Sequence, residues 1–277
     1  MTTHSHDNAV AVAAVQMTSG PDVNANLESA GALLAQAARE GARVALLPEN
    51  FAFMGLRDVD KRAVAERNGE GPIQDFLSRR ARELKLWIIA GTMPISEVAG
   101  ERVAAACLVY DDAGQRVARY DKIHLFDVDI PGRDEKYRES AHIVPGSRAV
   151  LVPTPAGLLG LSVCYDLRFP ELYRPLSAAG AQWFTVPSAF TVPTGRAHWE
   201  MLLRARAIEN LGFVVAAGQW GRHASGRETY GDSIIIDYWG TVLARLSAGQ
   251  GVVVATLDLA AQQLARRDFP ALSHRVL

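Results

Sequence analysis

The chain has 277 residues, of which 49% are apolar and 21% are charged, a composition typical of a soluble globular protein. Its formal net charge of −1 excludes a strong overall field that would recruit nucleic acid or an acidic membrane. No stretch reaches the roughly 20 apolar residues that a membrane-spanning helix needs. The two cysteines, Cys107 and Cys164, lie far apart in the sequence and favour a reducing, cytoplasmic location.

Strands and helices alternate along the chain after a tail at 1–8 that we expect to be disordered. Apolar residues recur at helical spacing after Asn24 and after Pro72, and short apolar runs separate these segments. The pattern predicts an α/β fold with a mixed sheet or two packed sheets flanked by helices, in one domain over residues 9–277. The expected strands are 10–17, 44–47, 86–90, 102–110, 116–123, 149–152, 158–163, 183–186, 213–217, 233–237, 241–246 and 252–257, and the expected helices are 24–40, 72–85 and 198–211, followed by a polar tail.

The segment 161–171 carries the strongest chemical signal. An apolar strand ends at Cys164, a polar turn follows, and Pro170 opens a helix. A thiol at such a turn is lifted out of the sheet, and the first helical N–H groups favour a thiolate or a developing oxyanion beside it. The layout is that of a nucleophile elbow with cysteine in place of serine, which indicates a covalent hydrolase.

Two further side chains occupy equivalent places at strand ends. Glu49 directly follows the strand 44–47, and Lys122 lies at the end of a hairpin strand. Ligands of α/β sheets bind in the crevice beyond the strand ends, so we expect both residues to lie near Cys164. A carboxylate, an ammonium and a thiol are the groups that acyl transfer through a thioester requires.

Three segments occur in order along the chain: LPENF at 47–51, YDKIHLF at 120–126 and VCYDLRFPE at 163–171. Together they resemble the signatures of the nitrilase superfamily of carbon–nitrogen hydrolases, and the similarity runs from about residue 11 to 259. The resemblance implies a four-layer α/β/β/α sandwich that pairs into an αββα-αββα homodimer or a higher homo-oligomer.

The same resemblance implies a Glu-Lys-Cys triad of Glu49, Lys122 and Cys164 and a small-molecule amide as substrate. Glu49 would take the thiol proton, and the oxyanion would be held by Lys122 and the backbone N–H of Tyr165. A second glutamate is expected in the loop after the lysine. Its match is Glu139, with Glu135 as the alternative because this loop varies in length.

Several other residues are expected to have structural and not catalytic roles. His124 lies two residues from Lys122 and would share its face in a regular strand, but in the family resemblance Glu49 already supplies the base. Cys107 is expected to be a buried strand residue, Asp166 to anchor the turn below the nucleophile, and Arg206 with Glu209 to form a helical i,i+3 pair. The histidines show no metal-ligand spacing, so we expect no metal and no cofactor.

The segment 187–200 resembles the Nit branch of the superfamily, and within it the deaminated-glutathione amidases, which cleave a 2-oxo-acid amide to 2-oxoglutarate and cysteinylglycine. Ser188, Thr191 and Thr194 would offer hydroxyl groups to this substrate and Phe190 an apolar wall. Arg168 either grips a substrate carboxylate or braces the turn. Open alternatives are an ω-amidase acting on 2-oxoglutaramate, an N-carbamoyl or nitrile hydrolase, and a non-catalytic binding protein on the same fold.

Overall fold

The computed structural model describes residues 9–96, 102–130 and 135–276. The tail expected at 1–8 lies outside the described residues.

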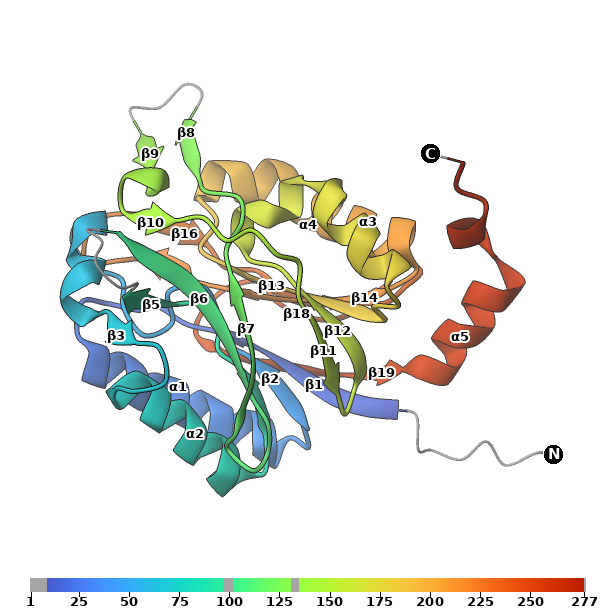
Figure 1. The fold of residues 1–277 in the computed structure, drawn as a ribbon, viewed down its shortest axis with the longest axis horizontal. Coiled ribbons are helices and arrows are strands. Elements are labelled where there is room, and N and C mark those ends of the chain that lie inside the picture. The colour runs from blue at the N-terminus through green and yellow to red at the C-terminus, as the bar shows by residue number, and fades with distance from the viewer. Residues whose placement is uncertain (1–8, 97–101, 131–134, 277) are drawn as a thin grey trace.

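Two β-sheets stack face to face in the middle of the molecule, and helices cover both outer faces (Figure 1). Helices α1 (Val23–Arg39) and α2 (Pro72–Leu84) cover one sheet, and α3 (Pro170–Ala178) and α4 (Val192–Asn210) cover the other. This arrangement is the four-layer α/β/β/α sandwich that the family resemblance implies.

The first sheet is built around the parallel strands β1, β2 and β4. Strand β1 pairs with β2 and β2 with β4 in parallel, whereas β19 pairs antiparallel with β1. Their order is β19-β1-β2-β4-β6-β5-β3, with β7 and β10 also paired to β6. The strands are β1 (Ala9–Gln16), β2 (Val44–Leu46), β3 (Glu66–Arg67), β4 (Trp87–Ile89), β5 (Met93–Ser96), β6 (Val103–Tyr110), β7 (Arg116–Asp121), β10 (Ile143–Val144) and β19 (Gly251–Asp258).

The second sheet has the order β11-β12-β13-β14-β17-β18, with β12, β13 and β14 parallel. Two short hairpins, β8–β9 and β15–β16, stand apart from both sheets and contribute to the site. The strands are β8 (Asp127–Asp129), β9 (Lys136–Arg138), β11 (Leu151–Thr154), β12 (Gly157–Leu161), β13 (Trp183–Ser188), β14 (Phe213–Gly218), β15 (Trp220–Arg222), β16 (Glu228–Tyr230), β17 (Ser233–Ile236) and β18 (Val242–Leu246).

The main core lies between the two sheets. Val12 and Val44 of the first sheet belong to the same buried cluster as Leu161, Val186 and Val215 of the second. Because residues of a strand alternate between faces, their neighbours Ala13 and Ala45 pack instead under α1 and α2. The apolar strands are therefore buried on both faces, as continuous apolar runs indicate.

The C-terminal half of the fold departs from the sequence prediction at two helices. Helix α4 begins at Val192 and not at residue 198, because Thr191 and Pro193 form its start. The supposed polar tail contains α5 (Leu259–Asp268), whose Asp258 cap accepts a hydrogen bond from the Ala261 N–H at 2.9 Å. Its buried positions, Leu259 and Gln262, lie three residues apart and were too few to indicate a helix.

Candidate active site

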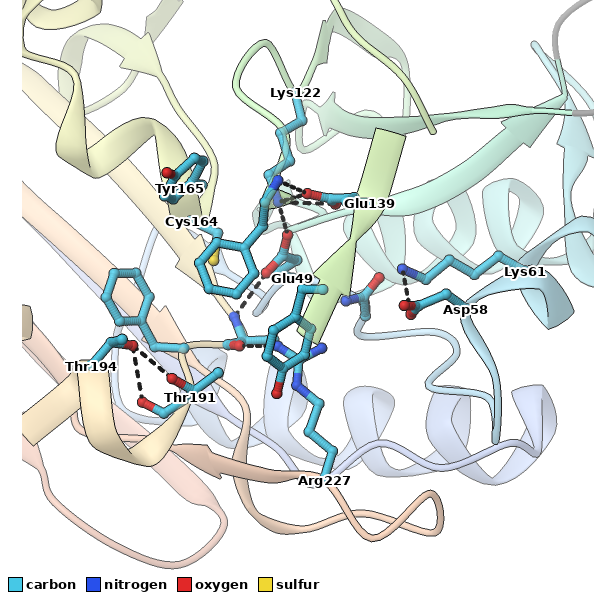
Figure 2. Close-up of a pocket in the computed structure, with 15 residues that line it drawn as sticks. Glu49, Asp58, Lys61, Lys122, Glu139, Cys164, Tyr165, Thr191, Thr194 and Arg227 are labelled. Carbon is cyan, nitrogen blue, oxygen red and sulfur yellow. Dashed lines mark hydrogen bonds and ion pairs between the residues drawn. The ribbon is translucent and has the colours of Figure 1, made fainter. Parts of the chain in front are cut away.

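The ends of several strands and loops enclose a small pocket of about 40 Å³, shown in Figure 2. Glu49, Lys122 and Cys164 come together there, as expected from their positions at strand ends. The pocket is lined by Glu49, Asn50, Asp58, Lys61, Lys122, Phe126, Tyr137, Glu139, Cys164, Tyr165, Ala189, Phe190, Thr191, Thr194 and Arg227.

Glu49 is a buried carboxylate whose two oxygens have different partners. One oxygen, Oε1, accepts from the Lys122 ammonium at 2.8 Å, and Oε2 accepts from the Ala189 N–H at 2.9 Å. The side chain is only 5% exposed. A backbone donor from one sheet and an ammonium from the other therefore fix the orientation of the carboxylate.

Lys122 follows β7 and places its Nζ between two carboxylates. Besides Glu49 it contacts both oxygens of Glu139, at 3.0 and 2.8 Å, with a side chain that is 2% exposed. Glu139 begins a short 3₁₀ turn after β9, and its Oε2 also accepts from the Phe126 N–H at 2.7 Å. Of the two glutamates considered from the sequence, the one in contact with Lys122 is Glu139. Glu135 instead accepts from the Tyr137 hydroxyl at 3.0 Å.

Cys164 lies at a strained turn with a φ of +48°. It opens a 3₁₀ turn over Cys164–Arg168, and α3 starts at Pro170. Asp166 anchors the turn from below: one carboxylate oxygen accepts from the Val163 N–H at 2.8 Å and from the Tyr120 hydroxyl at 2.6 Å. These bonds hold the turn in the conformation of a nucleophile elbow.

The electrostatics of the cluster give each group a protonation state. Burial opposes the charge of Glu49, but Lys122 outweighs it and holds the pKa of the carboxyl below its usual value. Burial likewise opposes the ammonium, yet Glu139 and Glu49 raise the pKa of Lys122 well above its usual value. Burial and the Glu49 charge raise the pKa of the Cys164 thiol. The resting site therefore contains a carboxylate, an ammonium and a neutral thiol, whereas the elbow alone favoured a thiolate.

The segment after β13 contributes only part of the expected substrate contacts. Phe190, Thr191 and Thr194 line the pocket, and the two threonine hydroxyls lie 2.7 Å apart. The structure does not bring Ser188 into it: this residue ends β13, is buried, and donates back to the Val186 carbonyl at 3.3 Å. Arg168 also lies outside the lining, with its guanidinium 5.5 Å from the Phe190 ring centroid.

Six lining residues were missed by the sequence reasoning. Lys61 lies in a 3₁₀ segment over Asp58–Val64, and Arg227 lies in the turn between β15 and β16. Neither belongs to a motif, and the only available signal was that Lys61 is one of four lysines in an arginine-rich chain. The missed set is Asn50, Asp58, Lys61, Phe126, Tyr137 and Arg227.

Other chemically suggestive residues have structural partners. His124 lies beyond the end of β7, and its Nδ1 is 2.7 Å from Asp166 Oδ1 while its ring stacks on Phe169. Cys107 is fully buried in β6. Arg206 pairs with Glu209 at 2.9 Å, as expected from their spacing.

The described parts of the chain contain neither a metal-binding cluster nor a membrane-spanning helix. Over residues 9–96, 102–130 and 135–276, no group of three His, Cys, Asp or Glu side chains could hold a metal ion. In the same residues every helix is too short or too polar to cross a bilayer.

Comparison with known proteins places these features in a family. The model of the carbon–nitrogen hydrolase family matches residues 11–267. A deaminated glutathione amidase of Yersinia enterocolitica is 39% identical over 264 residues, which cover 95% of this chain and 92% of that protein.

Solved structures agree with the sequence comparison. The Caenorhabditis elegans NitFhit protein superposes with a TM-score of 0.90 at 37% identity over 97% of this chain, which spans 65% of that longer chain. Saccharomyces cerevisiae Nit3, a member of branch 10 of the nitrilase superfamily, superposes with a TM-score of 0.88 at 28% identity over 98% of this chain and 97% of its own. The chain belongs to the carbon–nitrogen hydrolase family of the nitrilase superfamily.

Proposed function

We propose that the protein is an amidase that hydrolyses deaminated glutathione to 2-oxoglutarate and cysteinylglycine through a thioester on Cys164. The observation that carries this proposal is the cluster of Glu49, Lys122 and Glu139 in one pocket with the thiol. Similarity to deaminated glutathione amidases over 95% of the chain supports the substrate.

The acylation half begins with the neutral thiol. The ionised Glu49 takes the proton of Cys164 as the sulfur attacks the amide carbonyl carbon, which forms the C–S bond and an oxyanion. The Lys122 ammonium and the Tyr165 N–H stabilise that oxyanion. Protonated Glu49 then gives its proton to the amide nitrogen, the C–N bond breaks, and cysteinylglycine leaves as the amine.

The deacylation half repeats these steps with water. Glu49, again ionised, takes a proton from a water molecule that attacks the thioester carbonyl carbon. The C–S bond then breaks, 2-oxoglutarate leaves, and the proton returns to the sulfur. Glu139 contacts Lys122 and not Cys164 in the described contacts, which supports a positioning role for this second carboxylate.

The acyl half of the substrate is proposed to lie beside Phe190, Thr191 and Thr194. Hydroxyl groups there suit the 2-oxo carboxylate, which needs hydrogen-bond donors. Arg168 is proposed to add a charge on this side after its side chain rotates. Within the described residues it forms no ion pair, and its hydrogen bond is to His198 Nδ1 at 3.3 Å. Ser188 is left out of this set because its hydroxyl turns back onto β13.

The assembly and location follow the same resemblance. We propose that residues 9–277 form one hydrolase domain, which works as a homodimer or a higher homo-oligomer in the cytoplasm. Met201 and Ile208 are exposed apolar residues of α4 that a second copy would cover. Both cysteines are free thiols, which suits a reducing compartment.

A comparison of kcat/KM values tests the substrate. The panel contains deaminated glutathione, 2-oxoglutaramate, an N-carbamoyl amino acid and an aliphatic nitrile. Deaminated glutathione is expected to rank first. An N-carbamoyl compound or a nitrile at the top would refute the assignment, 2-oxoglutaramate at the top would make the protein an ω-amidase, and no turnover would favour a binding protein.

A further inference from the structure

Two cations of the active-site pocket have no role in the reaction described above. Lys61 and Arg227 both line the pocket, and Figure 2 shows Lys61 on the opposite side of the Glu49 carboxylate from Thr191 and Thr194. The Lys61 side chain is only 14% exposed. Two partly buried cations that face a pocket favour the binding of an anion there.

The charge on these two groups is compensated only in part. Lys61 has Asp58 Oδ1 at 4.0 Å, and the Asp58 side chain is 51% exposed. In the described part of the chain no carboxylate pairs with Arg227, which donates to the Ala189 carbonyl at 2.5 Å and packs over the Tyr137 ring. Its Nε is buried without a hydrogen-bond partner among the described residues. An unpartnered buried donor is costly unless a ligand satisfies it.

The pocket also continues outwards on this side. Asn50, Asp58, Lys61, Tyr137 and Arg227 line both the active-site pocket and an adjoining cavity of about 250 Å³. Neither threonine of the proposed acyl side belongs to that cavity. A substrate with groups on both sides of its scissile bond can therefore place one end against the threonines and extend the other past Lys61 and Arg227.

We propose that Lys61 and Arg227 form a leaving-group subsite that binds the terminal carboxylate of a peptide leaving group. This assignment rests on the proposed function, because deaminated glutathione carries one carboxylate beyond the 2-oxo group and another at the end of cysteinylglycine. The Glu49 carboxylate, which must protonate the leaving nitrogen, lies between the threonines and Lys61 in Figure 2. The subsite makes the enzyme selective for peptide amides over primary amides, whose leaving group is ammonia.

The wild-type enzyme provides the first test, without any substitution. The probes are deaminated glutathione and the same compound with its terminal glycine carboxylate converted to a carboxamide. The free carboxylate is expected to give at least about a tenfold higher kcat/KM, mainly through KM, since one charge-assisted contact contributes on the order of this factor. Equal values for the two probes would overturn the inference.

Two variants then locate the contact. Lys61→Met and Arg227→Met should each reduce the preference for the free carboxylate several-fold. Arg222→Met is the matched control, because Arg222 is exposed on the same β15–β16 hairpin and lies outside the pocket. Among the described residues Lys61 has one ion pair, at 4.0 Å, so its variant tests the subsite even if loss of Arg227 impairs folding. If a folded Lys61→Met enzyme kept the full preference for the free carboxylate over the carboxamide, Lys61 would not belong to the subsite. If both variants kept that preference, the assignment would be overturned.

The outcomes separate this inference from the proposed function. If deaminated glutathione is the best substrate of the panel but its carboxamide reacts equally well, the function stands and the subsite does not. If the enzyme hydrolyses 2-oxoglutaramate and neither peptide probe, both the substrate assignment and the subsite fail.

Discussion

Glu139→Gln separates a positioning role for this carboxylate from a role in proton transfer. Glu139 receives two contacts from Lys122 Nζ, at 3.0 and 2.8 Å, and one from the Phe126 N–H at 2.7 Å. The single carbonyl oxygen of glutamine can take the place of Oε2 and accept hydrogen bonds from both Lys122 Nζ and the Phe126 N–H. Its NH₂ group would then lie where Oε1 was, so that a donor faces the Lys122 ammonium.

The expected decrease in the acylation rate follows from this lost contact. One charge-assisted hydrogen bond contributes about 1.5–3 kcal/mol, and its loss in the transition state slows acylation about 10- to 100-fold. Deacylation of a preformed thioester uses the same Lys122 contact and should slow by no more than a similar factor, because Glu49 keeps its contacts with Lys122 and the Ala189 N–H. Rapid-quench measurement of acyl-enzyme formation and decay gives both rates separately.

Glu135→Gln is the matched control for this prediction. It makes the same chemical change four residues earlier, outside the pocket that contains Lys122. Its acylation rate should stay within about twofold of wild type, a difference too small to represent a catalytic hydrogen bond. Normal acylation followed by accumulation of the thioester in Glu139→Gln would refute the reasoning and make Glu139 the base for deacylation.

The remaining predictions concern Lys122 and the two cysteines. Lys122→Arg keeps the charge but not the compact ammonium, so kcat should fall about 10²–10³-fold; near-wild-type turnover would exclude the oxyanion role. Cys164→Ala should abolish turnover without loss of folding by circular dichroism, whereas Cys107→Ala should retain activity and lose roughly 1–2 kcal/mol in urea unfolding; the reverse pattern would exchange their roles. Because the pKa of the Cys164 thiol is raised, its alkylation by iodoacetamide should keep increasing through pH 9, and a plateau below pH 7 would show a resting thiolate instead. Because the pKa of Glu49 is lowered, kcat/KM should fall only below pH 4.5, and an acid limb well above that value would contradict an ionised base.

The meeting of Glu49, Lys122 and Cys164 in one pocket could be predicted from sequence because each lies in a short local motif at a strand end. Glu49 follows β2 and Lys122 follows β7 in the first sheet, and Cys164 follows β12 in the second, so the stacking of the two sheets brings these three strand ends together. The choice between Glu139 and Glu135 depended on the conformation of the loop around β9, which no local sequence pattern predicts.

The substrate side was less predictable because its contacts are tertiary. Lys61 and Arg227 reach the pocket from segments that carry no motif and are far apart in sequence. The start of α4 had a usable signal, since Thr191 and Pro193 are typical of a helix N-terminus. The direction of the Ser188 and Arg168 side chains could not be inferred without their neighbours, Val186 and His198.

Mass spectrometry of the enzyme after brief mixing with deaminated glutathione tests the central claim most directly. We predict a mass increase equal to one 2-oxoglutaryl group, located on the peptide that contains Cys164, with release of one equivalent of cysteinylglycine before 2-oxoglutarate appears. Slow turnover in Glu139→Gln or Lys122→Arg should change the amount of this adduct but not its position. Hydrolysis at an unchanged rate in Cys164→Ala, or an adduct on any other residue, would contradict the account.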